Sequence, residues 1–379
     1  MDPLFGNVIE DKSSPFKVAL LVFKYAGIFN KENRPWSLIF TKANTLVTIC
    51  VTILSCVDMI WGNEEMPEFV SALSAFLISI HINGKLFNFI YRETEIGHFI
   101  ERMEKLRQKI LQENCGKQIV LRADRVSIKM AKYYALFVLC CPTLSVASSI
   151  IINNVIGNRK AQPFFQIWLP WDITDIRINI ATNILVIFCV TPSVLVHLTF
   201  ATFSFIFTIE MSSFLQVLQS KLETLRLNDK MVYRLHAEII QLVEDYNNLF
   251  SLQIYMEICL SSVQPCGFGY TLIKAFKTHD IRMVDFIYKF LLTIVVPFII
   301  CTCGQEVNTQ LEKLHSSCYM CDWFEEKPAS RRYLLQLMMS TVRPHAIGFR
   351  RMITFDYVCF TSVLQGIYSF LTLVNQFGE

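Results

Sequence analysis

Seven apolar stretches, each long enough to cross a bilayer, constrain the fold of this 379-residue chain more than any other feature. They occupy residues 37–61, 67–91, 130–152, 178–209, 248–273, 284–305 and 352–375. A helix needs about 20 apolar residues to cross a hydrocarbon core about 30 Å thick, and every stretch reaches that length. The sequence therefore predicts an all-α membrane protein with seven transmembrane helices.

The Lys and Arg residues alternate between the gaps that separate these stretches. Four segments hold 25 of them, namely 1–36, 92–129, 210–247 and 306–351. The other three gaps hold six, in 62–66, 153–177 and 274–283. Cytoplasmic loops accumulate Lys and Arg, so we expect a cytoplasmic N-terminus and an extracellular C-terminus. This orientation is opposite to that of the G-protein-coupled receptors.

Little of the chain is left for a separate soluble domain. Apolar residues make up 53% of the sequence, and the longest gap, 306–351, has 46 residues. We expect one seven-helix domain over residues 1–379, in which 1–305 and 352–375 form the membrane bundle. The segment 306–351 is then a cytoplasmic anchor segment, and 352–375 is the last helix of the bundle.

Several helices are expected to continue from the membrane into the cytoplasm. Residues 93–114 carry apolar side chains at three- and four-residue steps and predict an amphipathic helix that prolongs the second span. The fourth span keeps a helical pattern past Glu210. The helix that enters the fifth span begins near Asn228 or Asp229, either of which suits an N-cap. With a short helix over 331–339, these pieces predict a cytoplasmic helical layer.

The sequence carries no motif of a metal, cofactor or catalytic site. Ten of its thirteen cysteines lie within apolar spans, where Cys behaves as a small hydrophobe. Cys318 and Cys321 have CxxC spacing, but a zinc site needs a second pair or histidines at ligand spacing, and His315 stands alone. Gly-rich phosphate loops, His-Glu-x-x-His and Gly-x-Ser-x-Gly are absent. We expect no cofactor, no metal, no catalysis and no nucleic-acid partner.

The gap at 153–177 differs in composition from the other gaps. It holds Pro163, Pro170, two Trp and two Phe, and Trp favours the headgroup level of a bilayer. Two interpretations stay open. The loop either covers a pocket that opens outward or anchors the chain at the membrane interface.

The last span is unusually polar for a membrane helix. Uncharged polar side chains fall near one face, at Gln365, Tyr368, Ser369, Thr372 and Gln376. Their spacing is i, i+3, i+4, i+7 and i+11. Such a stripe either hydrogen-bonds a neighbouring helix or lines water, and the residues alone favour neither.

An ordered set of residues in the C-terminal part of the chain carries a family resemblance. It comprises Cys318-Tyr319, Trp323-Phe324, Arg331-Arg332, Arg343-Pro344, and then Phe355 and the run Ile367-Tyr-Ser-Phe-Leu-Thr-Leu-Val374. This order resembles the C-terminal signature of insect odorant receptors. That signature has a Cys-Tyr pair ahead of a Trp, a basic patch, a break at proline and the run Thr-Tyr-Ser-Tyr-Phe.

Some positions depart from this signature. Ile367-Tyr368 stands in place of Thr-Tyr, and Phe370-Leu371 in place of the second aromatic pair. Sister gustatory receptors end in Thr-Tyr, five apolar residues and Gln-Phe. In this chain seven residues separate Tyr368 from Gln376, so the spacing of the gustatory receptor ending is not met.

The resemblance implies a ligand-gated, non-selective cation channel that assembles as a tetramer in the plasma membrane of olfactory sensory neurons. Such subunits work with the shared odorant receptor co-receptor (Orco), and the short gap 210–247 makes this chain similar to an odorant-specific tuning subunit. The last span would line the pore, with Tyr368, Thr372 and Gln376 near the outer constriction. The cytoplasmic layer would supply most subunit contacts. Volatile odorants, permeant cations and membrane lipid are the remaining implied partners.

The resemblance also places an odorant pocket in the outer half of the subunit, among spans two to six. Burying a small odorant gains about 25 cal/mol per Å² of apolar area, so we expect aromatic and aliphatic contacts with one or two polar groups. The candidates on these spans are Phe76, Leu77, Ile80, His81, Leu144, Ser148, Asn183, Ile187, Tyr270, Phe286 and Phe290. Ordinary packing between helices stays open for each of them, and a structural hydrogen bond for His81.

Other function classes fit the residues less well. A gustatory-type receptor channel or a homomeric chemoreceptor channel is the nearest alternative. Asp124-Arg125-Val126 is similar to the Asp-Arg-Tyr motif of G-protein-coupled receptors, but it precedes the third span, and the last span has no Asn-Pro-x-x-Tyr. A transporter would show repeated halves with spans broken at matched positions, and neither is visible.

Overall fold

Almost all of the described chain is α-helical. The computed structural model describes residues 14–26, 28, 35–62, 66–113, 116–156, 165–171, 173, 175–224, 230–278, 283–321, 323–325, 327–342, 346–350 and 352–377. Its elements are, in order, α2 (Pro15–Tyr25), α3 (Pro35–Trp61), α4 (Met66–Tyr91), α5 (Glu93–Gln112), α6 (Lys117–Ile156), α7 (Ile176–Thr224), α8 (Lys230–Thr278), α9 (Met283–Met320), η1 (Trp323–Glu325), α10 (Pro328–Thr341), β1 (Gly348–Phe349), β2 (Ile353–Thr354) and α11 (Tyr357–Phe377).

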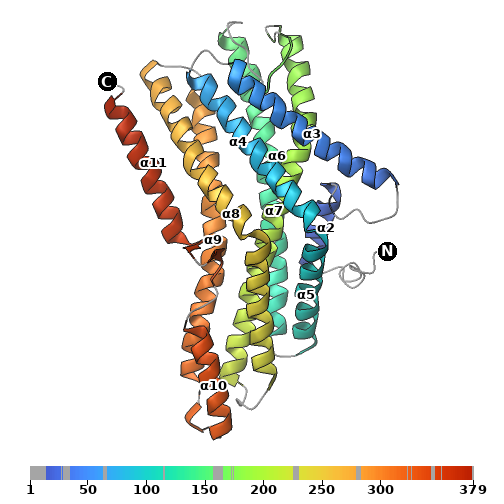
Figure 1. The fold of residues 1–379 in the computed structure, drawn as a ribbon, viewed down its shortest axis with the longest axis vertical. Helices are drawn as coiled ribbons and strands as arrows, with labels where there is room; N and C mark the ends of the chain where they lie inside the picture. Colours follow the sequence, from blue (N-terminus) through green and yellow to red (C-terminus); the bar gives the residue numbers. More distant parts are fainter. Residues whose placement is uncertain are drawn as a thin grey trace.

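The helices form an elongated bundle with two levels (Figure 1). The upper level holds α3, α4, α11 and the adjoining parts of α6 to α9. The lower level, which we call the anchor layer, holds α5, α10 and the other ends of α6 to α9. The helices α7 and α8 have 49 residues each. At 1.5 Å per residue each is about 73 Å long, so both run through the two levels.

Five helices of the described chain are long and apolar enough to cross a membrane. They contain the segments Thr41–Trp61, Glu68–Tyr91, Ile176–Glu223, Phe286–Met320 and Tyr357–Gln376. The fold is therefore that of an all-α membrane protein, as expected. The other two expected spans, 130–152 and 248–273, lie on the long helices α6 and α8. The count of seven spans stays a prediction.

The expected continuity of the helices is confirmed at two places and wrong at a third. The fourth and fifth spans run into the anchor layer as the unbroken helices α7 and α8. The second span does not continue into the next helix, because α4 ends at Tyr91 and α5 begins at Glu93. Between them Arg92 has φ −102° and ψ 23°, outside the helical region. The expected N-caps at Asn228 and Asp229 lie outside the described residues.

Two short elements escape the sequence pattern. Helix α2 begins at Pro15 and buries Phe16, Ala19 and Phe23 in the core. A two-stranded hairpin of β1 and β2 precedes α11, so the last helix begins at Tyr357, five residues later than expected.

One side chain of α8 forms two hydrogen bonds with the backbone at the hairpin. Asn247 Nδ2 donates to the Ala346 carbonyl at 2.9 Å, and Asn247 Oδ1 accepts from the Gly348 N–H at 3.1 Å. At the turn Arg350 has φ 50°, in the left-handed region that residues with a Cβ rarely adopt. The root of α11 is thereby tied to α8.

Aromatic packing joins α5, α7 and α8 in the middle of the bundle. Phe207 and Tyr246 stack with ring centroids 3.8 Å apart, and Phe99 lies 5.8 Å from Phe207. Phe203 and Phe250 extend this cluster, with centroids 5.2 Å apart. The amphipathic helix predicted over 93–114 is confirmed as α5, whose apolar face is buried here.

A buried ionic cluster ties α5 to α6 within the anchor layer. Arg107 is fully buried, and its Nε and Nη2 donate to the two carboxylate oxygens of Asp124 at 2.9 and 2.8 Å. Its Nη1 donates to Glu104 Oε1 at 2.9 Å. The other Glu104 oxygen accepts from the Ser14 hydroxyl at 2.8 Å, which brings the start of α2 into the cluster. Asp124 thus belongs to the packing of the anchor layer.

The three helices α7, α8 and α9 each contain one internal proline. These are Pro192, Pro265 and Pro297. A proline inside a helix lacks the N–H that would bond four residues back, and its ring bends the helix. All three lie in the upper level.

Candidate functional site

The upper level contains a partly open cavity of about 300 Å³, which we call the main cavity. Its wall comes from α4, α6, α7, α8 and α9, together with Phe165 and Gln166 of the segment that follows α6. Apolar side chains form most of the wall and include Ala75, Ile78, Ile82, Phe137, Val138, Val190, Val194, Leu260, Phe268, Leu292 and Val296. A space of this size, mostly apolar with a few polar groups, is typical of small-molecule sites.

The α6–α7 connection contributes directly to this wall. Ile167 packs in a small cluster with Val51, Val186 and Val190, and the Trp168 N–H donates to the Leu54 carbonyl at 3.1 Å. These contacts hold the preceding residues Phe165 and Gln166 at the cavity. Their position agrees with a loop that covers a pocket.

An ionic group lies at the end of the main cavity nearer the anchor layer. Glu257 of α8 accepts from Lys85 Nζ at 2.6 Å through Oε2, and His81 Nε2 lies 3.3 Å from the same oxygen. Lys85 is fully buried, and its ammonium also lies 4.8 Å from the ring centroid of Phe200. Charges within a membrane helix are costly unless paired, so this pair fixes α4 against α8.

A histidine and a tyrosine extend the group to α6 and α7. Lys85 Nζ lies 3.2 Å from His197 Nδ1, and Tyr134 Oη lies 2.8 Å from His197 Nε2. An ammonium only donates, so Nδ1 accepts and the proton of a neutral His197 resides on Nε2. That N–H then donates to the Tyr134 oxygen. We call Lys85, Glu257, His81, His197 and Tyr134 the ionic group.

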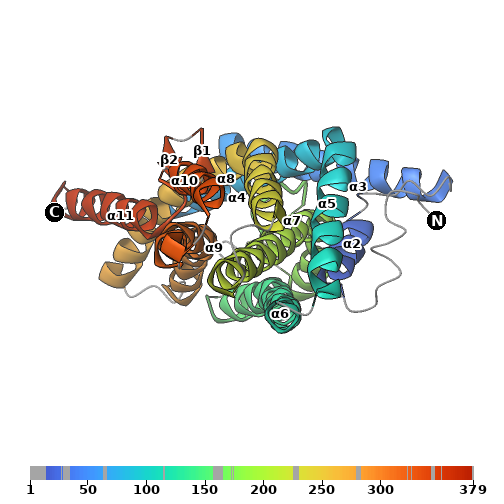
Figure 2. The same cartoon turned by 90° about the horizontal axis from the view of Figure 1, so that it is seen from below.

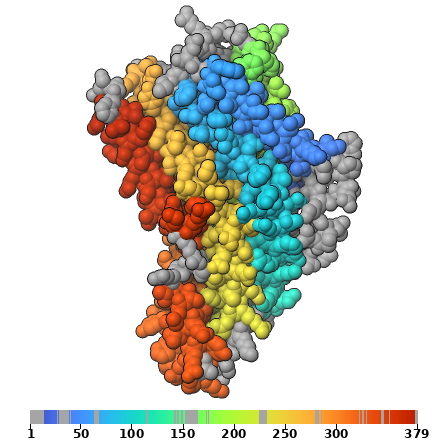
Figure 3. Space-filling model, viewed as in Figure 1, coloured from blue at the N-terminus to red at the C-terminus, as the bar shows by residue number. Residues whose placement is uncertain are grey.

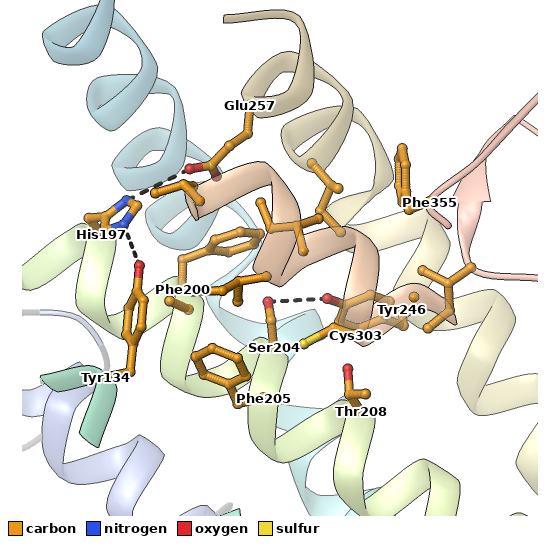
Figure 4. Close-up of a pocket in the computed structure, with 17 residues that line it drawn as sticks. Tyr134, His197, Phe200, Ser204, Phe205, Thr208, Tyr246, Glu257, Cys303 and Phe355 are labelled. Atoms are coloured by element: carbon orange, nitrogen blue, oxygen red, sulfur yellow. Dashed lines mark hydrogen bonds and ion pairs between the residues drawn. The ribbon is translucent and has the colours of Figure 1, made fainter. Parts of the chain in front are cut away.

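A second, smaller cavity of about 30 Å³ lies on the other side of the ionic group (Figure 4). Tyr134, His197 and Glu257 line both cavities. Figure 4 places His197 and Glu257 at one end of the small cavity and Phe355 at the other, with the hydrogen bond between Tyr246 and Ser204 between them. Phe355 is fully buried and lies two residues before α11.

The root of α11 is in close contact with α9. Gly304 of α9 has no side chain, and a Cβ built there would lie 1.9 Å from the Phe355 carbonyl oxygen. Asn308, one turn further along α9, accepts from the Ile347 N–H at 2.9 Å. The N–H of Phe355 donates to the Ile347 carbonyl at 3.0 Å. The segment before α11 is therefore fixed to α9 by backbone contact.

The helix α11 lies at the edge of the bundle beside α8 and α9 (Figures 1 and 2). Val363 and Ile367 are buried against the bundle. The five residues of the polar stripe are all exposed, namely Gln365, Tyr368, Ser369, Thr372 and Gln376. In the space-filling view α11 forms one flank of the molecule (Figure 3). Within this chain the stripe faces away from the other helices.

A family model described as 7tm Odorant receptor matches residues 65–368. The chain belongs to the odorant receptor family. It is 22% identical to odorant receptor 47a of Drosophila melanogaster, over 95% of this chain and 97% of that protein. It is 20% identical to odorant receptor 9a of the same species, over 100% of this chain and 99% of the relative.

A solved structure shares the fold of this odorant receptor family member. It is the insect olfactory receptor OR5 from Machilis hrabei in complex with eugenol. The TM-score is 0.77, and the match covers 95% of this chain and 97% of that chain. At 13% sequence identity it supports the fold alone.

The structure brings one predicted ligand contact of this odorant receptor into the main cavity. Of the nine candidates with described side chains, His81 lines the wall. The other eight lie elsewhere: Phe76, Leu77, Ile80, Asn183, Ile187, Tyr270, Phe286 and Phe290. Leu144 and Ser148 have side chains outside the described ones. The assignment of these residues as ligand contacts stays a prediction.

The faces of the helices explain why these eight residues are not in the wall of the main cavity. On α4 one face of the helix lines the cavity, and Phe76, Leu77 and Ile80 lie on the other faces. The lining residues of α4 are Ser71, Ser74, Ala75, Ile78, Ser79, His81 and Ile82. Ile80, for example, is 45% exposed on the surface of the bundle. The sequence indicated which helices form the pocket, but not which face of each helix turns inward.

Apart from His81, the ionic group is the part of the site that the sequence pattern missed. Lys85 and Glu257 are opposite charges within two predicted spans, which is a signal of a functional or structural pair. Their partnership depends on the packing of α4 against α8, which no local pattern contains. No three His, Cys, Asp or Glu side chains of the described chain come together as a metal site.

Proposed function

We propose that this chain is the odorant-specific subunit of an odorant-gated, non-selective cation channel in the plasma membrane of olfactory sensory neurons. It acts in a heterotetramer with the shared co-receptor. The observation that carries the proposal is the main cavity of about 300 Å³, walled by five helices and large enough for a small volatile molecule. The relative from Machilis hrabei was solved with eugenol, a small aromatic compound, which supports a ligand of this kind.

The pore of this channel is lined by α11. Its polar stripe lies on an exposed face, opposite the buried Val363 and Ile367. Exposed glutamine, threonine and tyrosine are unfavourable in lipid and favourable around water. Four such helices around an axis would form a wet passage with Tyr368, Thr372 and Gln376 near its outer end.

The contacts between the cavities suggest how ligand binding reaches the pore. A ligand in the main cavity touches His81, Tyr134, His197 and Glu257, which also belong to the ionic group. Three of these residues line the small cavity, whose far end is Phe355 at the root of α11. A ligand that favours one arrangement of the ionic group therefore biases the position of α11, by the difference of its affinities for the two states.

The energy available from one site limits the response. Shifting an equilibrium from 1:99 to 99:1 requires about 5.5 kcal/mol of differential binding. A small odorant with few polar atoms provides little more than this in total affinity. We therefore expect partial activation, or activation that needs several occupied subunits.

We expect odorant-evoked cation current when the chain is expressed with the co-receptor. Cells that express the chain without the co-receptor, and cells that carry an empty vector, should give no such current. The measurement is whole-cell recording against volatile alcohols, esters and aromatics, with GTP omitted from the pipette in half of the cells. Current that depends on GTP would contradict the channel proposal. Current from this chain expressed alone would support a homomeric channel instead.

The position of α11 at the pore predicts a specific chemical block. Thr372→Cys should make the odorant-evoked current sensitive to a charged methanethiosulfonate applied from outside, because the thiol then faces the permeation path. Val374→Cys is the matched control, since Val374 lies on the half-buried side of α11. The unsubstituted receptor gives the background from native cysteines. Equal block of both variants, or of neither, would place the stripe outside the pore.

A further inference from the structure

Five polar side chains in the wall of the main cavity make no hydrogen bond within the described chain. They are the hydroxyls of Ser71, Ser74, Ser193 and Ser261 and the amide of Gln264. Each residue is buried, with 4 to 8% of its surface exposed. Two of them lie one turn apart on α4, two lie on α8 and one lies on α7. These are three separate walls of the same cavity.

Other hydroxyls in these helices behave differently. Ser79, Ser262 and Thr199 each donate to the carbonyl four residues back, at 2.9, 2.9 and 2.7 Å. Such a bond to the backbone is the ordinary way for a serine or threonine to satisfy its hydroxyl inside a membrane helix. The five polar groups of the wall lack it, so they are directed to whatever occupies the cavity.

A buried polar group without a partner costs about 1–3 kcal/mol. An occupant that replaces water in the cavity must therefore supply hydrogen bonds of its own, or binding loses that energy. A hydrocarbon of suitable shape would leave all five groups unsatisfied. A ligand with oxygen atoms would satisfy some of them.

The charges of the wall indicate that the ligand is neutral. Glu257 and Lys289 give the described wall one carboxylate and one ammonium, so the wall offers no net charge to a ligand. Glu257 is already paired with Lys85 Nζ at 2.6 Å. A cationic ligand would have to compete with that buried ammonium, and an anionic one would meet the carboxylate.

We infer that the main cavity selects neutral, oxygen-bearing ligands and binds most tightly those with two separated hydroxyl groups. One oxygen engages Ser71 and Ser74 of α4, and the other engages Ser261 and Gln264 of α8. This inference rests on the proposed function of the cavity as the odorant site. It adds the chemical class of the odorant, which the apolar part of the wall does not specify.

The test uses three aromatic compounds of similar size. Ethylbenzene has no oxygen, benzyl alcohol has one, and meta-hydroxybenzyl alcohol has two. The receptor is expressed with the co-receptor, and the half-maximal concentration of each compound is measured for the parent and for variants. Ser74→Ala and Ser261→Ala each remove one unpaired hydroxyl. Ser262→Ala is the matched control, because its hydroxyl bonds the Ile258 carbonyl and it is not in the cavity wall.

In each of the two wall variants, the half-maximal concentration of at least one alcohol should rise about threefold to tenfold relative to that of ethylbenzene. This is the change expected for the loss of one neutral hydrogen bond. The double variant should remove the advantage of meta-hydroxybenzyl alcohol over benzyl alcohol. In Ser262→Ala, the ratio of the half-maximal concentration of each alcohol to that of ethylbenzene should be unchanged. Ratios that stay constant in the wall variants, or that change equally in Ser262→Ala, would overturn the inference.

A second readout separates this inference from the channel proposal. A ligand that binds the folded protein raises its melting temperature, so the same compounds are added to the purified receptor in detergent. Suppose that the alcohols raise the melting temperature of the parent, and raise it less in Ser74→Ala and Ser261→Ala, while evoking no current. That result would support the ligand class and contradict the proposed channel. Current evoked equally by ethylbenzene and the alcohols would leave the channel intact and overturn the ligand class.

Discussion

Replacing Lys85 with methionine should unfold much of the receptor or keep it from the cell surface. The substitution preserves the length of the side chain but removes the ammonium that lies 2.6 Å from Glu257. Glu257 then holds a buried negative charge with only histidines nearby. Breaking one side of a buried ion pair costs about 3–5 kcal/mol, a large part of the stability of any folded protein. The measurement is the melting temperature in detergent, together with surface labelling of intact cells.

A double substitution tests whether the pair itself is responsible. Lys85→Met combined with Glu257→Leu leaves no uncompensated charge, so surface expression and melting temperature should recover most of the loss. The recovered protein should respond to odorants differently, because Glu257 lines both cavities. A double variant that is less stable than Lys85→Met would show that the two charges do not act as a pair.

Replacing Arg107 with methionine should have a comparable effect in the anchor layer. Arg107 donates to both oxygens of Asp124 and to Glu104, so its loss leaves two buried carboxylates without their cation. We expect a loss of about 3–5 kcal/mol in the free energy of unfolding. Tetramer formation should fall as well if the anchor layer carries the subunit contacts. Chemical denaturation and size-exclusion chromatography of the purified protein measure the two effects.

The control for this prediction is a surface arginine on the same helix. Arg102 pairs with Asp245 of α8, but its side chain is 44% exposed. Exposed ion pairs contribute about 0–1 kcal/mol, so Arg102→Met should be tolerated. If Arg102→Met and Arg107→Met destabilise the receptor equally, burial is not what gives the Arg107 cluster its strength.

The long helices could be predicted because their signals are local. The length of an apolar run and the three- and four-residue spacing in α5 are properties of consecutive residues, and α5, α7, α8 and α10 follow the predicted course. The break at Arg92 could not be predicted, since helical residues stand on both sides of it. The hairpin before α11 depends on Asn247, a residue about a hundred positions away, so no pattern near Gly348 announces it.

The candidate site was harder to predict for a related reason. A span that is apolar on all sides gives no hint of which face turns to a cavity, and the serines of α4 and α8 are indistinguishable in sequence from those that bond their own backbone. His81 can be singled out from the sequence because an imidazole within a membrane span is energetically costly unless it has a partner. Lys85 and Glu257 stand out equally, but their pairing becomes evident only when α4 and α8 are in contact.

The prolines inside α7, α8 and α9 separate a straight lower segment of each helix from an upper segment that can bend. Pro192, Pro265 and Pro297 each adjoin a residue of the main cavity wall, namely Ser193, Gln264 and Val296. Each proline removes one backbone hydrogen bond, so α7, α8 and α9 can all bend beside the main cavity. Below the prolines they are stiff and clamped together. Above the prolines each upper segment can tilt, so a ligand in the main cavity contacts the helices next to the positions where they bend most easily.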